Sequence, residues 1–307
     1  MSILHQPVMA QQALVALNIK KDGHYLDMTF GRGGHSNLIL QSLGKEGRLT
    51  AIDRDSEAVA YGQCIQDERF DINHGDFASL DLMMAGDKGG AFDGVLLDLG
   101  LSSPQLDDAE RGFSYRQAGK LDMRMDTSQG ISAAQWLEQV QEQELRRCIF
   151  LYGEEKQAGK IAKHIVKYRE SKAIETTEQL VAVLKEAMPF WYPKKHPARR
   201  TFQAIRMAVN QEWDQLEKGL EQAFARLAPG GRLVVISFHS IEHRIVKQFI
   251  QKYSAGNESY DRYSMHHQQE KCVQLKRIGR RVLPSVQEAE DNPRARSAQM
   301  RVAERLV

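Results

Sequence analysis

The sequence predicts an α/β fold with a mostly parallel sheet and an inserted all-helical subdomain. Three observations lead to this fold class. A glycine-rich turn joins an apolar run to a helical pattern near residue 30, strands and helices alternate from 24 to 104, and helical patterns without a convincing strand fill about 106 to 200. A strand, a glycine turn and a helix in that order open a nucleotide-binding βαβ unit.

The glycine turn follows a short buried strand. Gly31, Gly33 and Gly34 let the backbone turn sharply and approach a ligand with no Cβ in the way. The next strand, 48–53, ends in Asp53, roughly 20 residues after Gly31. A carboxylate at that place can accept both ribose hydroxyls of an adenosine, so the sequence predicts an adenosine cofactor.

The positions of the glycines indicate which adenosine cofactor this is. A dinucleotide fingerprint has glycines at 31, 33 and 36, but position 36 is Ser and the glycines are adjacent at 33 and 34. Asp27 lies just before the turn, where S-adenosylmethionine enzymes commonly carry an acid facing the amino-acid end of the cofactor. These features favour S-adenosylmethionine. A nicotinamide oxidoreductase and an ordinary strand-to-helix turn are the alternatives.

The remaining elements follow from the spacing of apolar residues. Further strands are predicted at 70–74, 92–98, 232–238, 273–278 and 298–303, and helices at 56–66, 132–149, 155–168, 176–189, 201–227 and 241–252. Capping boxes begin the helices at Ser132 and Thr176, and Pro229-Gly230-Gly231 ends the helix that precedes the strand 232–238.

This order of elements predicts two domains. We expect a discontinuous cofactor-binding domain made of 1–105 and 201–307, and an inserted helical domain over 106–200 for substrate recognition. The polar segment 254–270 is expected to be a mobile loop.

The composition limits the class of protein. The chain has 307 residues, of which 42% are hydrophobic and 27% charged, and its net charge is +2. No run of about eighteen apolar residues is present, the first residues do not form a signal peptide, and the three cysteines are scattered. We therefore expect a cytoplasmic protein without a membrane partner, and only local charge clusters can indicate other partners.

The end of the strand 92–98 carries the residues expected to do chemistry. Ligands of an open α/β sheet bind at the carboxyl ends of its strands. Asp98 ends this strand, and Ser102, Ser103 and Pro104 follow it. Enzymes that methylate exocyclic amines of bases often have an acid or amide followed by a proline there. We expect Asp98 to hold the target amine and the Ser-Ser-Pro turn to shape a pocket for a flipped-out base. The alternative is an ordinary strand end.

A second candidate for the same pocket is His239, which follows the strand 232–238. Its alternative is a buried imidazole satisfied by backbone groups. His239-Ser240-Ile241-Glu242-His243 also matches a His-x-x-Glu-His zinc pattern. That pattern requires a helix, whereas His239 should lie in a turn, so no metal is predicted.

Several charged segments could contact RNA. The segment 190–200 mixes aromatics with cations, as proteins that hold single-stranded nucleic acid do. Two basic clusters, 276–281 and 294–296, lie near the C-terminus. Each of these could also be an ordinary solvated face, and the two acids around Arg124 could be a structural ion pair.

Together these motifs resemble the bacterial 16S ribosomal RNA cytosine-N4 methyltransferase family. The matching stretches are spread over nearly the whole chain: 31–35, 51–55, 96–100, 102–106, 111–114, 121–126, 152–155, 200–204, 209–210, 236–240 and 292–297. The resemblance implies a Rossmann-like class I methyltransferase domain, S-adenosyl-L-methionine as methyl donor, and N4-methylation of one cytosine in the P-site decoding region of 16S rRNA in the small ribosomal subunit. A non-catalytic ribosome-binding factor on a methyltransferase scaffold is the alternative.

The resemblance also implies a set of cofactor-binding residues. By motif matching these are Gly33, Gly34, His35, Asp53, Phe77, Asp98 and Gln105. The chain departs from the usual family pattern at Lys120, Arg199 and His243, where the family usually has Pro, Thr and Asp. None of the three departures touches the cofactor set.

Overall fold

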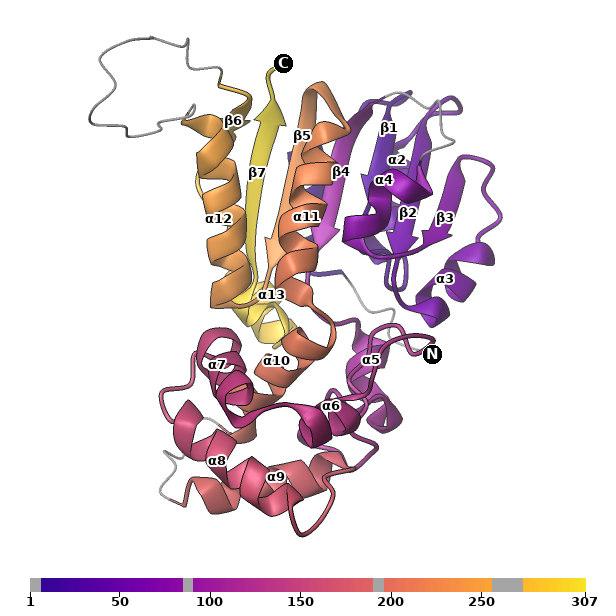
Figure 1. Cartoon of the computed structure of the whole chain (residues 1–307). Helices are drawn as coiled ribbons and strands as arrows, with labels where there is room; N and C mark the ends of the chain where they lie inside the picture. Colours follow the sequence, from indigo (N-terminus) through magenta and orange to yellow (C-terminus); the bar gives the residue numbers. More distant parts are fainter. Residues whose placement is uncertain (1–6, 85–90, 190–195, 256–272) are drawn as a thin grey trace, which may run out of the picture. The chain divides into compact units, whose positions relative to one another are not determined.

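The computed structural model describes residues 7–84, 91–189, 196–255 and 273–307. The chain divides into two compact units (Figure 1). Unit 1 contains residues 1–100 and 214–307, and unit 2 contains residues 101–213. The predicted domains had their boundaries at 105/106 and 200/201. The second boundary therefore falls within a helix of unit 2, and the assignment of that unit to substrate recognition stays a prediction.

Unit 1 is built on a seven-stranded sheet with the order β3-β2-β1-β4-β5-β7-β6. The strands are β1 (His24–Asp27), β2 (Arg48–Asp53), β3 (Phe70–His74), β4 (Phe92–Asp98), β5 (Leu227–Ser237), β6 (Leu275–Arg277) and β7 (Gln299–Arg305). The first five pair in parallel, whereas β7 pairs antiparallel with both β5 and β6. The predicted α/β class with a mostly parallel sheet is confirmed.

The helices of unit 1 lie between its strands in the sequence or precede the first of them (Figure 1). They are α1 (Ala10–Leu17), α2 (Gly34–Ser42), α3 (Ser56–Gln63), η1 (Phe77–Ser79), α4 (Leu80–Met83), α11 (Glu212–Ala225), α12 (Ser240–Ser254), α13 (Val286–Asp291) and η3 (Ala295–Ser297). Leu17 from α1, Ile39 from α2 and Val234 from β5 belong to one buried apolar cluster. That core fixes the strand ends and the loops that follow them.

Unit 2 is helical. It contains α5 (Ser103–Asp107), η2 (Ala109–Arg111), α6 (Ala133–Gln139), α7 (Glu142–Gly153), α8 (Ala158–Arg169), α9 (Thr177–Ala187) and α10 (Ala198–Val209). It has its own core, to which α7, α8 and α10 contribute Ile149, Ile161 and Ile205. Ser132 and Thr176 cap α6 and α9 through capping boxes, as the sequence predicted.

Two predicted helices are wrong because each is two helices. Instead of one helix over 132–149, the backbone becomes extended at Val140 and Gln141, between α6 and α7. Instead of one helix over 201–227, Gln211 adopts a φ of 51° between α10 and α11. Apolar spacing continues across both breaks, so periodicity alone does not reveal them.

Other elements differ at their boundaries. The strand predicted over 232–238 begins at Leu227, so Pro229-Gly230-Gly231 lies within β5 rather than before it, where its register against β4 shifts. The helices α1 and α13 were not predicted. Most of the predicted loop 254–270 lies outside the described residues. Within the described part of the chain, no helix is long and apolar enough to cross a membrane.

Candidate functional site

The glycine turn after β1 adopts the conformation that its sequence requires. Gly31 and Gly33 have φ angles of 56° and 70°, values that L side chains rarely adopt. A Cβ on Gly33 would lie 2.9 Å from the ring of Phe30, so the position is closed to larger residues. Gly34 is the first residue of α2, whose leading backbone N–H groups have no side-chain cap. Such a helix start favours a negatively charged ligand group.

Asp27, at the end of β1, is buried beside this turn. Its Oδ2 accepts a hydrogen bond of 2.6 Å from the Ser36 hydroxyl, and its Oδ1 accepts one of 3.0 Å from the Thr29 backbone. Burial raises the pKa of Asp27, while the bond from Ser36 and the nearby His35 act in the opposite direction. The carboxyl is thus held between two segments of the glycine turn.

Asp53, at the end of β2, holds the same turn from the neighbouring strand. Its Oδ2 accepts a hydrogen bond of 2.7 Å from Gly31 N–H, and its Oδ1 accepts one of 2.8 Å from Asp55 N–H. Burial raises the pKa of Asp53 to about 6, and the two hydrogen bonds only partly offset that effect. An ionised carboxylate offers about four acceptor sites, so two remain for ribose hydroxyls.

His35 and Asp98 face each other across the ends of α2 and β4. His35 Nε2 lies 3.4 Å from Asp98 Oδ2, and the imidazole is buried. Burial alone would lower the pKa of His35, but the close carboxylate of Asp98, together with the charge of Asp27, raises it overall. Thr29 Oγ1 accepts a bond of 2.6 Å from Asp98 N–H. These contacts fix Asp98 from two directions.

The second carboxylate oxygen of Asp98 is free. Oδ1 is buried and has no hydrogen-bond partner among the described residues. A buried acceptor without a donor costs about 1–3 kcal/mol. A donor supplied by a ligand would recover that free energy, which makes this atom the strongest sign of a binding site in unit 1.

Phe77 begins η1, shortly after the end of β3. Gly219 on α11 makes room for it, because a Cβ there would lie 2.4 Å from Phe77 Cβ. Gly75 N–H donates to the backbone oxygen of Asp53 at 2.9 Å, which ties this loop to the end of β2. Phe77, the aromatic residue expected to pack on adenine, is therefore two residues from Gly75, which contacts the backbone of Asp53, the predicted ribose acceptor.

His239 is the residue before the first turn of α12. Its Nε2 lies 3.0 Å from Glu242 Oε1, and Glu242 Oε2 accepts bonds of 2.7 and 3.2 Å from the backbone N–H groups of Phe238 and His239. The imidazole thus has a carboxylate neighbour rather than only backbone groups. Glu242 holds the loop after β5 in place.

The zinc-like motif has other uses in this structure. His243 Nδ1 lies 2.7 Å from the Ser237 hydroxyl, which donates to the backbone oxygen of Gln299. Burial lowers the pKa of His243, and the charges of His239, Arg301 and Arg281 add to that effect. Glu242 and His243 therefore have hydrogen-bond partners in the protein, whereas both ring nitrogens of His239 are buried without one among the described residues. The absence of a metal stays a prediction.

Ser102, Ser103, Pro104 and Gln105 lie at the start of unit 2. Ser102 Oγ accepts from Gln105 N–H at 3.4 Å, and Gln105 Oε1 accepts from Ser102 N–H at 3.0 Å, so the two residues form a capping box on α5. Pro104 lies in the first turn of that helix. The local structure of the turn is therefore set by its own sequence, and its role in a base pocket stays a prediction.

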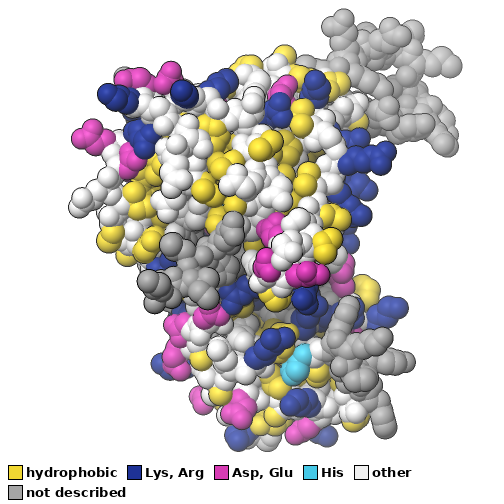
Figure 2. Space-filling model, turned by 180° about the vertical axis from the view of Figure 1, so that it is seen from behind, with side chains coloured by type: hydrophobic (Ala, Val, Ile, Leu, Met, Phe, Trp, Pro, Cys, Tyr) yellow, Lys and Arg dark blue, Asp and Glu magenta, His cyan; other side chains and the backbone are white. Residues whose placement is uncertain are grey.

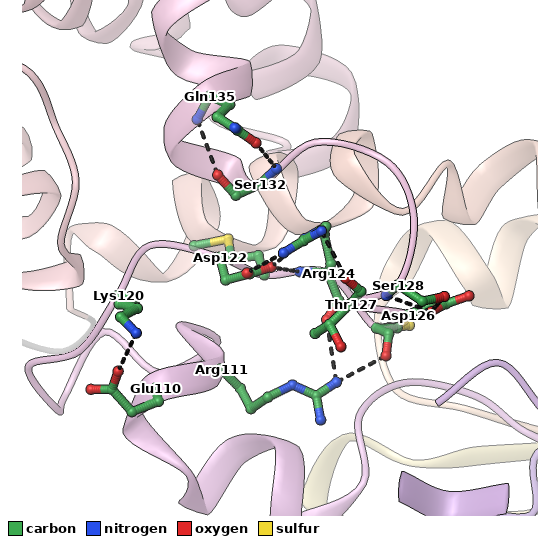
Figure 3. A network of polar contacts seen from close by, with 12 residues as sticks. Glu110, Arg111, Lys120, Asp122, Arg124, Asp126, Thr127, Ser128, Ser132 and Gln135 are labelled. Atoms are coloured by element: carbon green, nitrogen blue, oxygen red, sulfur yellow. Dashed lines mark hydrogen bonds and ion pairs between the residues drawn. The ribbon is translucent and has the colours of Figure 1, made fainter. Parts of the chain in front are cut away.

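The acids around Arg124 form a structural network in unit 2 (Figure 3). Arg124 contacts both oxygens of Asp122, with donor–acceptor distances of 2.8 and 2.7 Å. Burial would raise the pKa of Asp122, but these bonds and the charge of Arg124 lower it overall. Arg111 donates to the backbone oxygen of Met125 at 2.9 Å. Of the two interpretations of this motif, these contacts favour the structural one.

The aromatic and cationic segment 190–200 is only partly described. Residues 190–195 lie outside the described ranges. His196 stacks on Tyr115 with ring centroids 4.7 Å apart, and Arg200 Nη1 lies 3.2 Å from Glu155 Oε2. Arg199 is exposed. Two of the described residues therefore have structural partners.

Two contacts of the site were not predicted. In the sequence, Ser36 stands out only because it breaks the dinucleotide fingerprint, yet its hydroxyl donates a hydrogen bond to Asp27. Thr29 also was not a candidate, although it orders Asp98 through its hydroxyl. The signal for Ser36 was the departure from the glycine pattern, whereas nothing in the sequence marks Thr29, because its partner is 69 residues away.

The fold and the strand ends together define a class I methyltransferase. The five parallel strands extended by an antiparallel pair have the order of that class, and the glycine turn with its two acids is at the expected edge. The chain belongs to the MraW methylase family, whose model matches residues 2–306. Membership in this family confirms the resemblance found in the motifs and removes the oxidoreductase alternative.

One sequence relative agrees with this assignment, and two solved structures align with most of the chain. Ribosomal RNA small subunit methyltransferase H of Hydrogenovibrio crunogenus is 49% identical over 304 residues, covering 98% of this chain and 96% of the relative. An rRNA methylase from Streptococcus thermophilus aligns over 99% of both chains with 10% identity and a TM-score of 0.42. The N-methyltransferase NodS of Bradyrhizobium japonicum, in complex with S-adenosyl-L-homocysteine, aligns over 99% of this chain and 90% of its own with 9% identity and a TM-score of 0.42. At these TM-scores the two structures add nothing about substrate or site residues.

Proposed function

We propose that this protein transfers a methyl group from S-adenosyl-L-methionine to N4 of one cytosine in the P-site decoding region of 16S rRNA. The 49% identical relative is named as a methyltransferase of small-subunit ribosomal RNA, which supports the class of substrate. The choice of cytosine N4 rests on the motif resemblance and on the acid at the end of β4.

The residues of unit 1 fit the cofactor. Asp53 offers ionised acceptors for ribose hydroxyls, and Phe77 offers an aromatic face for adenine. The start of α2, with Gly33 and Gly34, suits the carboxylate of the methionine end, and Asp27 suits its ammonium group. When bound, the cofactor supplies a methyl group on a sulfonium, an electrophile that needs no metal.

Asp98 carries the chemical part of the proposal. The exocyclic amine of cytosine is a poor nucleophile because its lone pair is delocalised into the ring. An acceptor that holds one of its hydrogens favours the pyramidal nitrogen that attacks, and the free Oδ1 of Asp98 is such an acceptor. His35 lies beside the other oxygen, with its Nε2 3.4 Å from Oδ2. Positioning of this kind supplies most of the rate in methyl transfer.

The proton balance also involves Asp98. The amine loses one proton as its nitrogen gains a methyl group, and Asp98 Oδ1 is the acceptor on the chain for that proton. The raised pKa of His35 favours the imidazolium form of that side chain beside Asp98. Asp98 then returns the proton to solvent when the product leaves.

The discriminating experiment is transfer of labelled methyl to small-subunit particles and to naked 16S rRNA from cells that lack this activity. We expect incorporation at one cytosine, identified as N4-methylcytidine after nuclease digestion. Methylation of a different base would contradict the specificity. Binding to particles without any transfer by the parental protein would favour the non-catalytic ribosome-binding factor.

A further inference from the structure

Three arginines lie close together at the antiparallel edge of the unit 1 sheet. Arg277, on β6, pairs with Ala303 on β7, and Arg301 is two residues along β7 on the same face. Such diagonal neighbours lie roughly 7–8 Å apart. The bridge between Val282 and Met300 brings the preceding residue, Arg281, beside Arg301. The antiparallel pairing with β7 thus brings three guanidinium groups close together.

These arginines have no acidic partners. In the described part of the chain, none of the three side chains forms a hydrogen bond or ion pair, and Arg301 Nε is buried without a partner. Burial lowers the pKa of Arg301, and the charges of Arg281 and Arg277 lower it further. Elsewhere in this sheet, the guanidinium of Arg232 is 2.8 Å from Glu304. The cluster is therefore a place where an anion would be stabilised.

The cluster lies near the edge of the sheet where the strands end. Arg301 pairs with Val235, two residues before the end of β5. His243 of α12 is near enough for Arg301 and Arg281 to lower its pKa, so it adds little charge at neutral pH. Figure 2 shows Lys and Arg side chains gathered along the side of unit 1 that carries β6 and α12.

We propose that Arg277, Arg281 and Arg301 bind successive phosphates of the RNA strand next to the target nucleotide. The inference rests on the proposed function, since it assigns the cluster to the substrate of the same site. Guanidinium groups bind phosphate oxygens through paired hydrogen bonds, and they are weakly hydrated enough to sit together. The paired strands β6 and β7 would hold the RNA strand while the target base enters the site at the ends of β4 and β5.

Salt dependence tests this inference directly. The affinity of a short unstructured single-stranded RNA is measured at several salt concentrations for the full chain, the single variants Arg277→Gln and Arg281→Gln, and the double variant. The slope of log K against log salt is negative, and each lost phosphate contact should reduce its magnitude by about 0.7. The double variant should therefore reduce it by about 1.4. Affinity of the double variant should fall roughly tenfold at physiological salt.

The matched control is Lys45→Gln. Lys45 is exposed in the loop before β2, at the opposite end of the strands, so its loss should leave the slope unchanged. Arg301→Lys keeps the charge of the half-buried position but removes paired bonding, and it should give a smaller loss than the double variant. Unchanged slopes in both single variants, with unchanged melting temperature, would overturn the inference.

This result is separable from the proposed function. If the parental protein methylates particles and the arginine variants keep the parental KM and salt slope, the inference fails and the function stands. If the parental protein transfers no methyl group, the function fails whatever the slopes are. Binding of an acidic peptide that competes equally with RNA, and that also requires the three arginines, would contradict the assignment to RNA.

Discussion

Buried and half-buried acids of the two units have opposite electrostatic surroundings. In unit 1, Asp27 and Asp53 contact hydroxyl and backbone donors, and burial raises the pKa of both. In unit 2, Asp122 contacts Arg124 through both oxygens, and its pKa is lowered. An acid whose oxygens both accept hydrogen bonds from an arginine of the protein has little acceptor capacity left for a ligand. An acid held by neutral donors keeps acceptor capacity for a ligand, so the comparison separates candidate binding residues from structural ones.

The largest effect should come from Asp98, whose Oδ1 has no hydrogen-bond partner among the described residues. Asp98→Asn removes the charge and replaces one acceptor, so methyl transfer should fall on the order of a hundredfold or more. Cofactor affinity, measured by calorimetry, should change only a few-fold. The matched control is Asp93→Asn, in the same strand, where Asp93 pairs with Lys20 at 2.6 Å. Parental transfer rates in Asp98→Asn would place the chemistry elsewhere.

His239→Ala is a companion to that experiment. His239 contacts Glu242, which holds the loop after β5. A loss of transfer with cofactor affinity kept would place His239 at the substrate. A change in melting temperature alone would assign it to the loop.

The next largest effect concerns Asp53 and cofactor affinity. Asp53→Ala removes the acceptors for the ribose and the bonds that hold Gly31 and Asp55. Affinity for S-adenosyl-L-homocysteine should weaken by roughly 1–3 kcal/mol, from the loss of charge-assisted hydrogen bonds. Calorimetry measures it directly. An unchanged affinity would show that the ribose is held by other residues.

Substitution of Asp122 should lower the stability of the protein and leave its cofactor affinity unchanged. Asp122→Asn breaks the pair with Arg124, so the free energy of unfolding should fall by about 1–2 kcal/mol. Cofactor affinity should stay at the parental value, because this acid is structural. Chemical denaturation of the variant and its parent gives the first quantity. A loss of cofactor affinity without a loss of stability would remove the contrast between the two units.

The smallest effect is a pH dependence of cofactor binding. Because the pKa of Asp53 is raised to about 6, the acid gains a proton as pH falls through that value and loses acceptor capacity. Affinity should therefore be constant above pH 7 and fall up to tenfold per unit below pH 6. Asp53→Asn, which does not titrate, should bind more weakly and flatten this profile. The same slope in the variant would assign the titration to another group.

The sequence predicted the strands better than the helix breaks. The strands β2, β3 and β4 begin and end at the predicted residues. For β2 and β4 the reason is that buried parallel strands are apolar runs bounded by polar residues, whereas β3 is an edge strand in which apolar and polar residues alternate. The break at Gln211 was invisible, because its φ of 51° occurs at a residue that is neither glycine nor proline. Local composition does not encode that choice.

The site was predictable to the extent that its residues end strands. Asp27, Asp53 and Asp98 were found because strand ends share one edge of a parallel sheet. The pairing of His35 with Asp98 and the support from Thr29 depend on contacts between distant segments. Those contacts decide which oxygen of Asp98 remains free, and only the folded chain shows it.

The position of unit 2 in the sequence has a consequence for synthesis of the chain. The strand β4 ends at Asp98, but its neighbour β5 begins only at Leu227, after all of unit 2. At about 5–20 residues per second, a ribosome needs roughly 6–26 s to produce that interval. For this time the apolar strand β4 has an edge with no partner, which is the kind of surface that aggregates. We therefore expect the nascent chain to need chaperones until β5 has left the ribosome and paired with β4.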